Sequence, residues 1–311
     1  MTYSVGGTIQ ASDYNGFVGS TAVNVAYAND GAAQNKVAAL IGVGYGTRGY
    51  GQTSTNVSVV SAGVQVSAGQ WNNLRSVMST LNTHTGSALT LQSVVAAGGT
   101  IQAFDGSSGR ANISSLISTL DTNRNNADVT DMTLSSALTS TRSTNWSTNI
   151  DHQLTMTFAS EDQARYYFNS GGQIRFSGSL TGGSNPDATA WTNLLSQMGT
   201  IKMGASTTTY TGAGGTITNN VGYFGLTGTY QQIFIHYGSG AYATAQYNIQ
   251  VRRESYVGAN GGNGSVIRAL ITFDNNSLGT VNGTITSQID QYKATGVLTI
   301  TNPTWATING L

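Results

Sequence analysis

Cysteine is absent from the chain, which excludes disulfides, thiolate zinc sites and cysteine nucleophiles. Charge is scarce as well: 8% of the 311 residues are charged, against roughly 25% in an average soluble protein, and 13 basic groups balance 13 acidic ones. A neutral surface has no basic field that attracts phosphate backbones or anionic lipids. We therefore expect neither a nucleic-acid partner nor a membrane partner.

Long hydrophobic runs are missing too, and no segment approaches the roughly 20 apolar residues that a membrane-spanning helix needs. The N-terminal segment MTYSVGGTIQASDYNG has neither the basic region nor the apolar region of a secretory signal. We expect the chain to fold in a cytoplasm and to leave it, if at all, by a route other than Sec secretion.

The second half of the chain is dominated by short segments in which apolar and polar residues alternate. This period of two is typical of strands with one buried face, and the many glycines between the segments are interpreted as turns. The alternating segments are 152–158, 173–180, 229–237, 242–251, 265–273, 280–289 and 297–301. We predict that they form an antiparallel β-sandwich.

The first half is less regular and predicts a mixed α/β structure. Residues 12–44 are compatible with one or two helices, whereas residues 56–68 look like a strand. Residues 111–146 begin with apolar residues at helical spacing, and their second part is compatible with another helix. The polar tail at 140–149 is the candidate domain junction.

Two segments of the chain repeat each other. Residues 71–81 (WNNLRSVMSTL) and 191–201 (WTNLLSQMGTI) share Trp, Asn, Leu, Ser, Met and Thr at the same offsets. In a helix, the tryptophan, leucine and methionine of each segment fall on one stripe, which predicts two amphipathic helices. Either each helix closes an open edge or end of its domain, or the two halves descend from a duplicated unit.

The glycines Gly44, Gly46 and Gly49 have the G-x-G-x-x-G spacing of dinucleotide-binding loops. Such a loop needs a strand before it, a helix N-terminus after it and an acidic residue about 20 positions later. Here the chain continues into a strand-like segment, and no Asp or Glu occurs between Asp30 and Asp105. We interpret the glycines as flexible turns and predict that the chain has no cofactor.

A calcium loop is the next candidate, because Asp121, Asn123 and Asn125 match the first three ligand positions of an EF-hand. The same loop needs glycine at position 6 and a bidentate glutamate at position 12, where this chain has Asn126 and Met132. We therefore predict no metal site and interpret the segment as a helix-to-helix connection.

Hydrolase chemistry needs a base that is oriented beside a nucleophile. The histidines His84, His152 and His236 are scattered, and no G-x-S-x-G motif accompanies them. Only His152 has an acidic neighbour, Asp151, and adjacent residues of a strand point to opposite faces. We interpret His152 and Asp151 as a surface pair, and His236 as a solvent-facing or interface residue.

Glycosidases need two close carboxylates, and the chain has only two glutamates, Glu161 and Glu254. Glu161 and Asp162 follow Ser160 in a pattern typical of the capped first turn of a short helix. We therefore predict that the chain is not an enzyme.

The segment ARYYFNSGGQIRFSGS (164–179) contains a glycine pair that resembles a ligand-binding loop. No helix N-terminus is predicted after the pair to present amide groups to a phosphate. We predict a β-hairpin instead, with Tyr166 and Phe168 on one face and a tight turn at 169–172.

In a chain with so little charge, arginines are the best candidates for contacts with another subunit. A buried arginine needs carboxylate or carbonyl partners, and Glu161 or Asp162 could supply one to Arg165 within the chain. The candidate interface residues are Arg165, Arg175, Arg252, Arg253 and Tyr256.

Several segments resemble virion structural proteins of tailed bacteriophages. SEDQARYYFNSGGQIRFSGSLTG resembles their R-Y-F-F-N-x-G-G-x-I hairpin, with Tyr167 in place of a phenylalanine; the Trp-containing ATAWTNLLSQMGTI and the strand-rich GYFGLTGTYQQIF follow it. Near the N-terminus, GGTIQASDYNGFVG and GVQVSAGQWNNLRSVMSTLNTHTG look like the G-x-I-x-A-x-x-W/Y-N-x-L segments of phage tail proteins. The resemblance touches both halves of the chain, but only through short motifs.

The resemblance implies a non-enzymatic subunit of the virion, in the tail, baseplate, collar or fibre-attachment region. Its partners would be other virion proteins and copies of itself, and it would be assembled in the host bacterial cytoplasm. The alternatives are a receptor- or glycan-binding tail adhesin whose Tyr and Trp rings stack on a host surface glycan, a head decoration protein and a tail-borne glycan hydrolase.

The predicted fold class is mainly β with some α. We expect a mixed α/β assembly domain over 1–149 and an antiparallel β-sandwich domain over 150–311.

Overall fold

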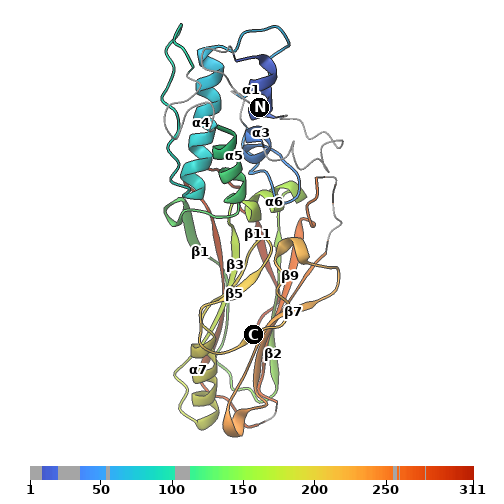
Figure 1. Ribbon diagram of the computed structural model, residues 1–311. Coiled ribbons are helices and arrows are strands. Elements are labelled where there is room, and N and C mark those ends of the chain that lie inside the picture. The colour runs from blue at the N-terminus through green and yellow to red at the C-terminus, as the bar shows by residue number, and fades with distance from the viewer. Residues whose placement is uncertain are drawn as a thin grey trace.

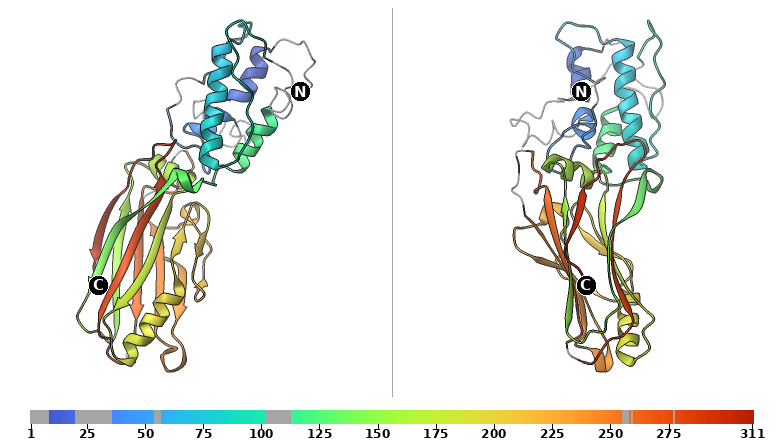
Figure 2. Two further views of the ribbon diagram at one scale, coloured as in Figure 1. Left: turned by 90° about the vertical axis from the view of Figure 1, so that its left-hand side faces the viewer. Right: turned by 180° about the vertical axis from the view of Figure 1, so that it is seen from behind.

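The computed structural model shows an elongated molecule with helices at one end and a β-sandwich at the other (Figure 1). The structure describes residues 9–19, 36–53, 57–101, 113–254, 258, 260–276 and 278–311. The strands run along the length of the sandwich, so their ends lie either beside the helices or at the far end of the molecule (Figure 2).

Two antiparallel sheets form the sandwich. The five-stranded sheet has the order β1-β10-β3-β4-β5, and the six-stranded sheet has the order β11-β2-β9-β8-β7-β6. The strands are β1 (Met132–Arg142), β2 (Asn149–Thr157), β3 (Gln173–Thr181), β4 (Ile201–Met203), β5 (Thr208–Tyr210), β6 (Thr216–Ile217), β7 (Gln231–Tyr237), β8 (Gln246–Arg253), β9 (Val266–Asp274), β10 (Thr284–Ala294) and β11 (Thr304–Asn309). The predicted fold class, mainly β with some α, is confirmed.

Alternating burial along the strands produces the core of the sandwich. In β9, Ile267, Ala269, Ile271 and Phe273 are buried, and the residues between them are half-exposed. This is the pattern expected of a strand whose two faces meet different environments. The period-two prediction works for most of the second half of the chain because these strands follow it strictly.

The helices occupy three places in the molecule. The helices are α1 (Ala11–Val18), α3 (Val37–Ile41), α4 (Ala68–Thr85), α5 (Ile113–Thr122), α6 (Glu161–Asn169) and α7 (Pro186–Met198), with short 3-10 turns η3 (Val129–Asp131), η4 (Tyr223–Gly225) and η5 (Gly240–Tyr242). The first four pack together beyond one end of the sandwich, α6 lies between them and the strands, and α7 lies at the opposite end (Figure 1).

The first repeated segment lies within α4, as predicted, and the second is helical over 191–198, because α7 ends at Met198 and Ile201 begins β4. In α4 the side chain of Ser67 accepts a hydrogen bond from the backbone of Gln70, and the Gln70 side chain accepts one from the Ser67 backbone in return, which forms a capping box. The tryptophans at the start of the two stripes, Trp71 and Trp191, are both buried. The two helices lie at opposite ends of the molecule, and α7 lies along one side of the sandwich near its far end (Figure 1).

The predicted β-hairpin over 164–176 is wrong, because α6 occupies its first arm. The capped first turn predicted at Ser160 is confirmed, since its side chain accepts a hydrogen bond from the backbone N–H of Gln163. The helix continues through the aromatic triplet, all of which is buried, and the chain then turns at Gly171 (φ 80°) into β3. The glycine pair therefore connects a helix to a strand.

Residues 132–142 form strand β1, so the helix predicted in the second part of 111–146 is also wrong. The segment after α5 is therefore a helix-to-strand connection through η3, where a helix-to-helix connection was predicted. Threonine and serine supply most of β1, and these residues suit an edge strand with an exposed face. The candidate junction at 140–149 connects β1 to β2, which belong to different sheets.

Two predicted strands are not formed. The described residues of 56–68 are irregular until α4 begins, and residues 297–301 precede β11, which starts just after Pro303. The latter segment pairs with a side chain instead: Gln52 donates its amide to the Thr299 carbonyl (3.0 Å) and accepts the Thr299 N–H (3.0 Å). The Gln52 side chain, from the helical end, therefore makes the hydrogen bonds to the Thr299 backbone that a neighbouring strand would otherwise make.

Candidate functional site

The candidate residues of α6 meet the glycine loop of residues 42–52 where the helices join the sandwich. The Arg165 side chain is completely buried. Its guanidinium donates to the carbonyls of Arg48 (2.6 Å) and Val43 (2.6 Å), and to Asp162 Oδ1 (3.0 and 3.2 Å). We call Arg165, Asp162 and the two carbonyl groups the arginine clamp. Because its donors are used inside the chain, Arg165 is not available for contact with another subunit.

The loop needs glycine to reach the clamp. Gly49 has φ 101°, and a Cβ at this position would lie 2.1 Å from the Val43 carbonyl oxygen. Asn169, one turn beyond Arg165, donates to the carbonyls of Gly46 (3.0 Å) and Gly49 (3.1 Å). The G-x-G-x-x-G loop thus presents carbonyl oxygens to a cation, whereas a phosphate would need N–H donors. The interpretation of these glycines as turns is confirmed at 45–48, where the N–H of Arg48 donates to the Tyr45 carbonyl (3.1 Å).

The acidic first turn of α6 anchors a second loop. Glu161 Oε1 accepts hydrogen bonds from the backbone N–H groups of Gly258 and Gly264 (3.1 Å for the latter). Asp162 Oδ2 accepts one from the Asn260 side chain (2.8 Å). Both carboxylates of this turn therefore serve as acceptors for the 258–264 loop and the arginine clamp.

A buried histidine makes a further contact between the helices and the sandwich. His84 Nδ1 at the end of α4 lies 2.5 Å from Asp131 Oδ2, and both residues are buried. The other oxygen of Asp131 accepts the N–H of Val297 (2.6 Å). Burial lowers the pKa of His84, although the hydrogen bond and charge of Asp131 act in the opposite direction.

His152 lies between the two sheets, so its interpretation as part of a surface pair with Asp151 is wrong. The ring is completely buried, and Nδ1 is 3.0 Å from the Ser287 hydroxyl of the opposite sheet. Burial lowers the pKa of His152 to about 4. The neighbouring acid points away because β2 alternates, so His152 acts as a polar contact in the core.

This buried ring predicts a pH-dependent stability. The unfolded chain binds a proton at His152 below pH 6.5, whereas the folded chain binds it only near pH 4, so stability falls as the pH falls between these values. We expect His152 to contribute a loss of about 2 to 3 kcal/mol between pH 7 and pH 4.5. Urea unfolding of wild type and His152→Gln over this range measures it.

The difference between the two proteins isolates His152, because burial also lowers the pKa of His84 and His236, which both proteins retain. The wild type should lose more stability on acidification than His152→Gln. Parallel pH profiles of the two proteins would contradict the prediction, because they would show that His152 has the same pKa in the folded and the unfolded chain.

The other candidate arginines are half-buried and have partners in the chain. The Arg175 guanidinium lies over the ring of Tyr292 at 3.8 Å from its centroid. Arg252 Nη2 donates to Glu254 (2.9 Å), and Arg253 Nε donates to the Leu226 carbonyl (3.2 Å). These three arginines keep exposed surface and remain candidate interface residues.

Tyr256, the fifth candidate interface residue, is outside the described residues. Glu254 also lies 2.6 Å from Arg268 Nε, so this glutamate neutralises two cations.

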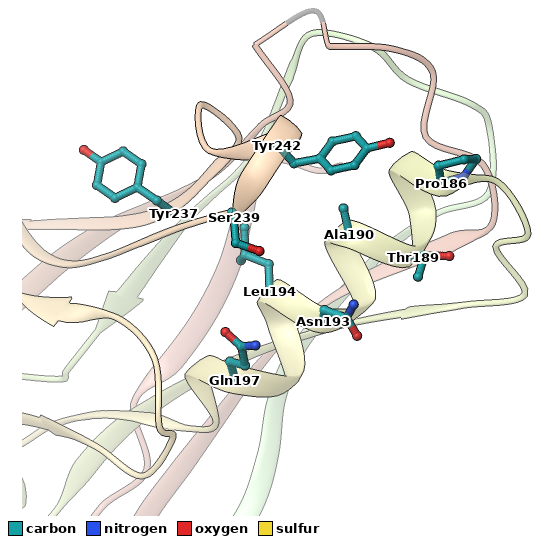
Figure 3. A pocket seen from close by; sticks show the side chains of 10 residues that line it. Pro186, Thr189, Ala190, Asn193, Leu194, Gln197, Tyr237, Ser239 and Tyr242 are labelled. Atoms are coloured by element: carbon teal, nitrogen blue, oxygen red, sulfur yellow. The ribbon is translucent and has the colours of Figure 1, made fainter.

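Sequence reasoning missed a pocket at the far end of the sandwich. It measures about 290 Å³ and lies between α7 and the loop that joins β7 to β8 (Figure 3). Its lining residues are Pro186, Thr189, Ala190, Asn193, Leu194, Gln197, Tyr237, Gly238, Ser239 and Tyr242. The available signal was the segment YGSGAY (237–242), a glycine loop with a tyrosine at each end.

Within the described ranges, no group of three or more His, Asp or Glu residues is placed to hold a metal ion. None of the helices in these ranges combines the length and the hydropathy of a membrane-spanning segment. No protein-family model matches the chain, and neither a curated protein nor a solved structure matches it.

Proposed function

We propose that this chain is a non-enzymatic structural subunit of a tailed-phage particle. In this proposal it lies in the tail, at the baseplate, the collar or the fibre attachment, and acts through repeated contacts with copies of itself and other virion proteins. The short motifs that resemble phage virion proteins support the proposal. The structural observation that carries it is one flank of the sandwich with two open strand edges.

This flank is formed by β1 and β11, which we call the open flank. Each is the last strand of its sheet, so one backbone edge of each strand has no neighbouring strand among the described residues. The two edges lie side by side, since the N–H of Leu311 donates to the Ser140 hydroxyl on β1 (2.9 Å). An open edge is a ready template for pairing with another chain.

The open flank has few of the features that prevent edge strands from pairing with another chain. Arg142 is the single charged residue of β1, and β11 has none. Isolated sandwiches usually protect such edges with charge or proline. Bulges at Ala137 and Ile308 interrupt the ladders and limit pairing with another chain to short stretches. Association through repeated copies is consistent with this design.

The contacts of the acidic and basic side chains support a non-enzymatic role. General acid–base catalysis needs a titratable group that faces a substrate. Here these groups serve in structural contacts: Glu161 binds backbone amides, Asp162 is part of the arginine clamp, and His152 binds Ser287 in the core.

Charge on the open flank should prevent self-association. Leu134 and Ile308 are 50% and 46% exposed, so replacing both with lysine should leave the fold intact. We expect the wild type to form oligomers and Leu134→Lys/Ile308→Lys to associate about tenfold or more weakly, because like charges would meet across the contact. Sedimentation velocity over a concentration series measures this.

Val64→Lys is the matched control, because Val64 is 50% exposed but lies in the helical end, before α4. The control should associate as the wild type does. A wild type that stays monomeric at every concentration, or equal association by the double variant, would show that the open flank is not an assembly surface.

A further inference from the structure

We propose that the pocket at the far end of the sandwich binds a neutral glycan. This proposal concerns a different surface from the open flank and holds whether or not the chain belongs to a phage particle. It rests on the composition of the pocket, on the unpartnered polar groups of α7, and on the way glycines shape the β7–β8 loop.

Tyr242 supplies the aromatic surface of the pocket. Its ring lies across from Pro186 and Ala190 of α7, whereas the ring of Tyr237, which is 53% exposed, points away from α7 (Figure 3). A tyrosine ring has an apolar face and a polar tip, so it can cover the C–H face of a sugar ring while its hydroxyl bonds to a sugar hydroxyl.

Uncharged hydrogen-bonding groups complete the pocket. Asn193 and Gln197 lie one turn apart on α7, and both are exposed. Their side-chain amides make no hydrogen bond within the part of the chain that the structure describes, and the same holds for the Ser239 hydroxyl on the facing loop. Amide and hydroxyl groups both donate and accept, as sugar hydroxyls do. These groups are therefore free to bond to a sugar.

The loop is shaped by its glycines. A Cβ at Gly238 would lie 2.2 Å from the Tyr242 carbonyl oxygen, and Gly240 has φ 58°. The N–H of Gly238 donates to the Ala245 carbonyl (2.8 Å), which closes the loop. Only glycine permits this close return of the backbone, and the return places Tyr242 opposite α7. The aromatic side of the pocket is thus built by the local sequence.

The absence of charge decides which ligand fits. No Asp, Glu, Lys or Arg is among the residues that line the pocket. An anionic or cationic ligand would lose its hydration there without gaining an ion pair. A neutral sugar loses less hydration free energy on entering the pocket, and it forms new hydrogen bonds with the lining groups. The pocket is at the lower end of ligand-site volumes, about 300 to 1,000 Å³, which suits one or two sugar rings. Without a lining carboxylate, the pocket would bind a glycan and not cleave it.

The test uses the full chain on a printed array of neutral and acidic glycans from bacteria, fungi and plants. Saturation-transfer NMR and titration calorimetry then follow with the bound glycans. We expect binding to neutral glycans, with the strongest transfer to protons of one sugar face. Tyr242→Ala and Asn193→Ala should each weaken binding about tenfold, and Tyr242→Phe, which keeps the ring, should weaken it less.

Asn73→Ala is the matched control, because Asn73 has the same place in the repeated segment of α4 at the other end of the molecule. It should bind as the wild type does, and circular dichroism should show that all variants are folded. Failure of every neutral glycan to bind, selective binding of acidic glycans, or equal binding by Tyr242→Ala and wild type would overturn the proposal. Competition by a peptide that binds the pocket more tightly than any glycan would assign it to a protein partner instead.

Discussion

Replacing Arg165 with methionine should lower the free energy of unfolding by about 3 to 5 kcal/mol. The substitution keeps most of the apolar stem but removes every donor of the arginine clamp. Asp162 and the carbonyls of Val43 and Arg48 would then lose hydrogen bonds that the buried guanidinium supplies. Since the clamp joins α6 to a loop of the helical end, we expect that end to loosen first.

Urea unfolding followed by circular dichroism measures the loss, and limited proteolysis shows which end opens. The stability of Arg165→Lys should lie between those of the wild type and Arg165→Met, because one ammonium group cannot reproduce the planar set of donors. Arg175→Met is the matched control: its guanidinium lies over Tyr292 on a half-exposed face, and its loss should cost about 1 kcal/mol or less. If Arg165→Met is as stable as this control, the clamp does not hold the two ends together.

Replacing Trp191 with alanine should destabilise the sandwich by about 3 to 5 kcal/mol. The indole is buried, packs edge-on against Trp146 with ring centroids 5.0 Å apart, and donates from Nε1 to the Asn275 side chain (2.8 Å). Alanine would leave a cavity where α7 covers the core and would leave Asn275 without its donor.

Trp191→Phe separates the packing from the hydrogen bond. This substitution should lower the free energy of unfolding by about 1 to 2 kcal/mol through the lost hydrogen bond. It should also leave a cavity, which is smaller than the one that alanine leaves. Trp71→Phe in α4 is the matched control, because Trp71 is equally buried and its Nε1 has no hydrogen-bond partner. We expect Trp191→Phe to cost more than Trp71→Phe in thermal and urea unfolding. Equal costs would show that the bond to Asn275 does not contribute.

The strands were predictable where burial alternates strictly. β9 follows that pattern along its whole length, and so does most of β2. The aromatic triplet of α6 was not predictable in this way, because all three rings are buried and a period cannot be read from an unbroken apolar run. The threonines and serines of β1 likewise carry little apolar signal.

The candidate sites were predictable only as far as local chemistry reaches. The need of a buried Arg165 for a carboxylate pointed correctly to Asp162, three residues away. The carbonyl partners at Val43 and Arg48 lie more than 100 residues earlier, and only the tertiary fold brings them close. The pocket was missed for the same reason, because its two sides come from α7 and a later loop.

The proposed assembly role is tested most directly by imaging, at side-chain resolution, the phage particles whose genome encodes this chain. The account predicts repeated copies of the elongated subunit in the tail region, with β1 and β11 of each copy against a neighbouring subunit. Particles that contain no density and no peptides for this chain would contradict it.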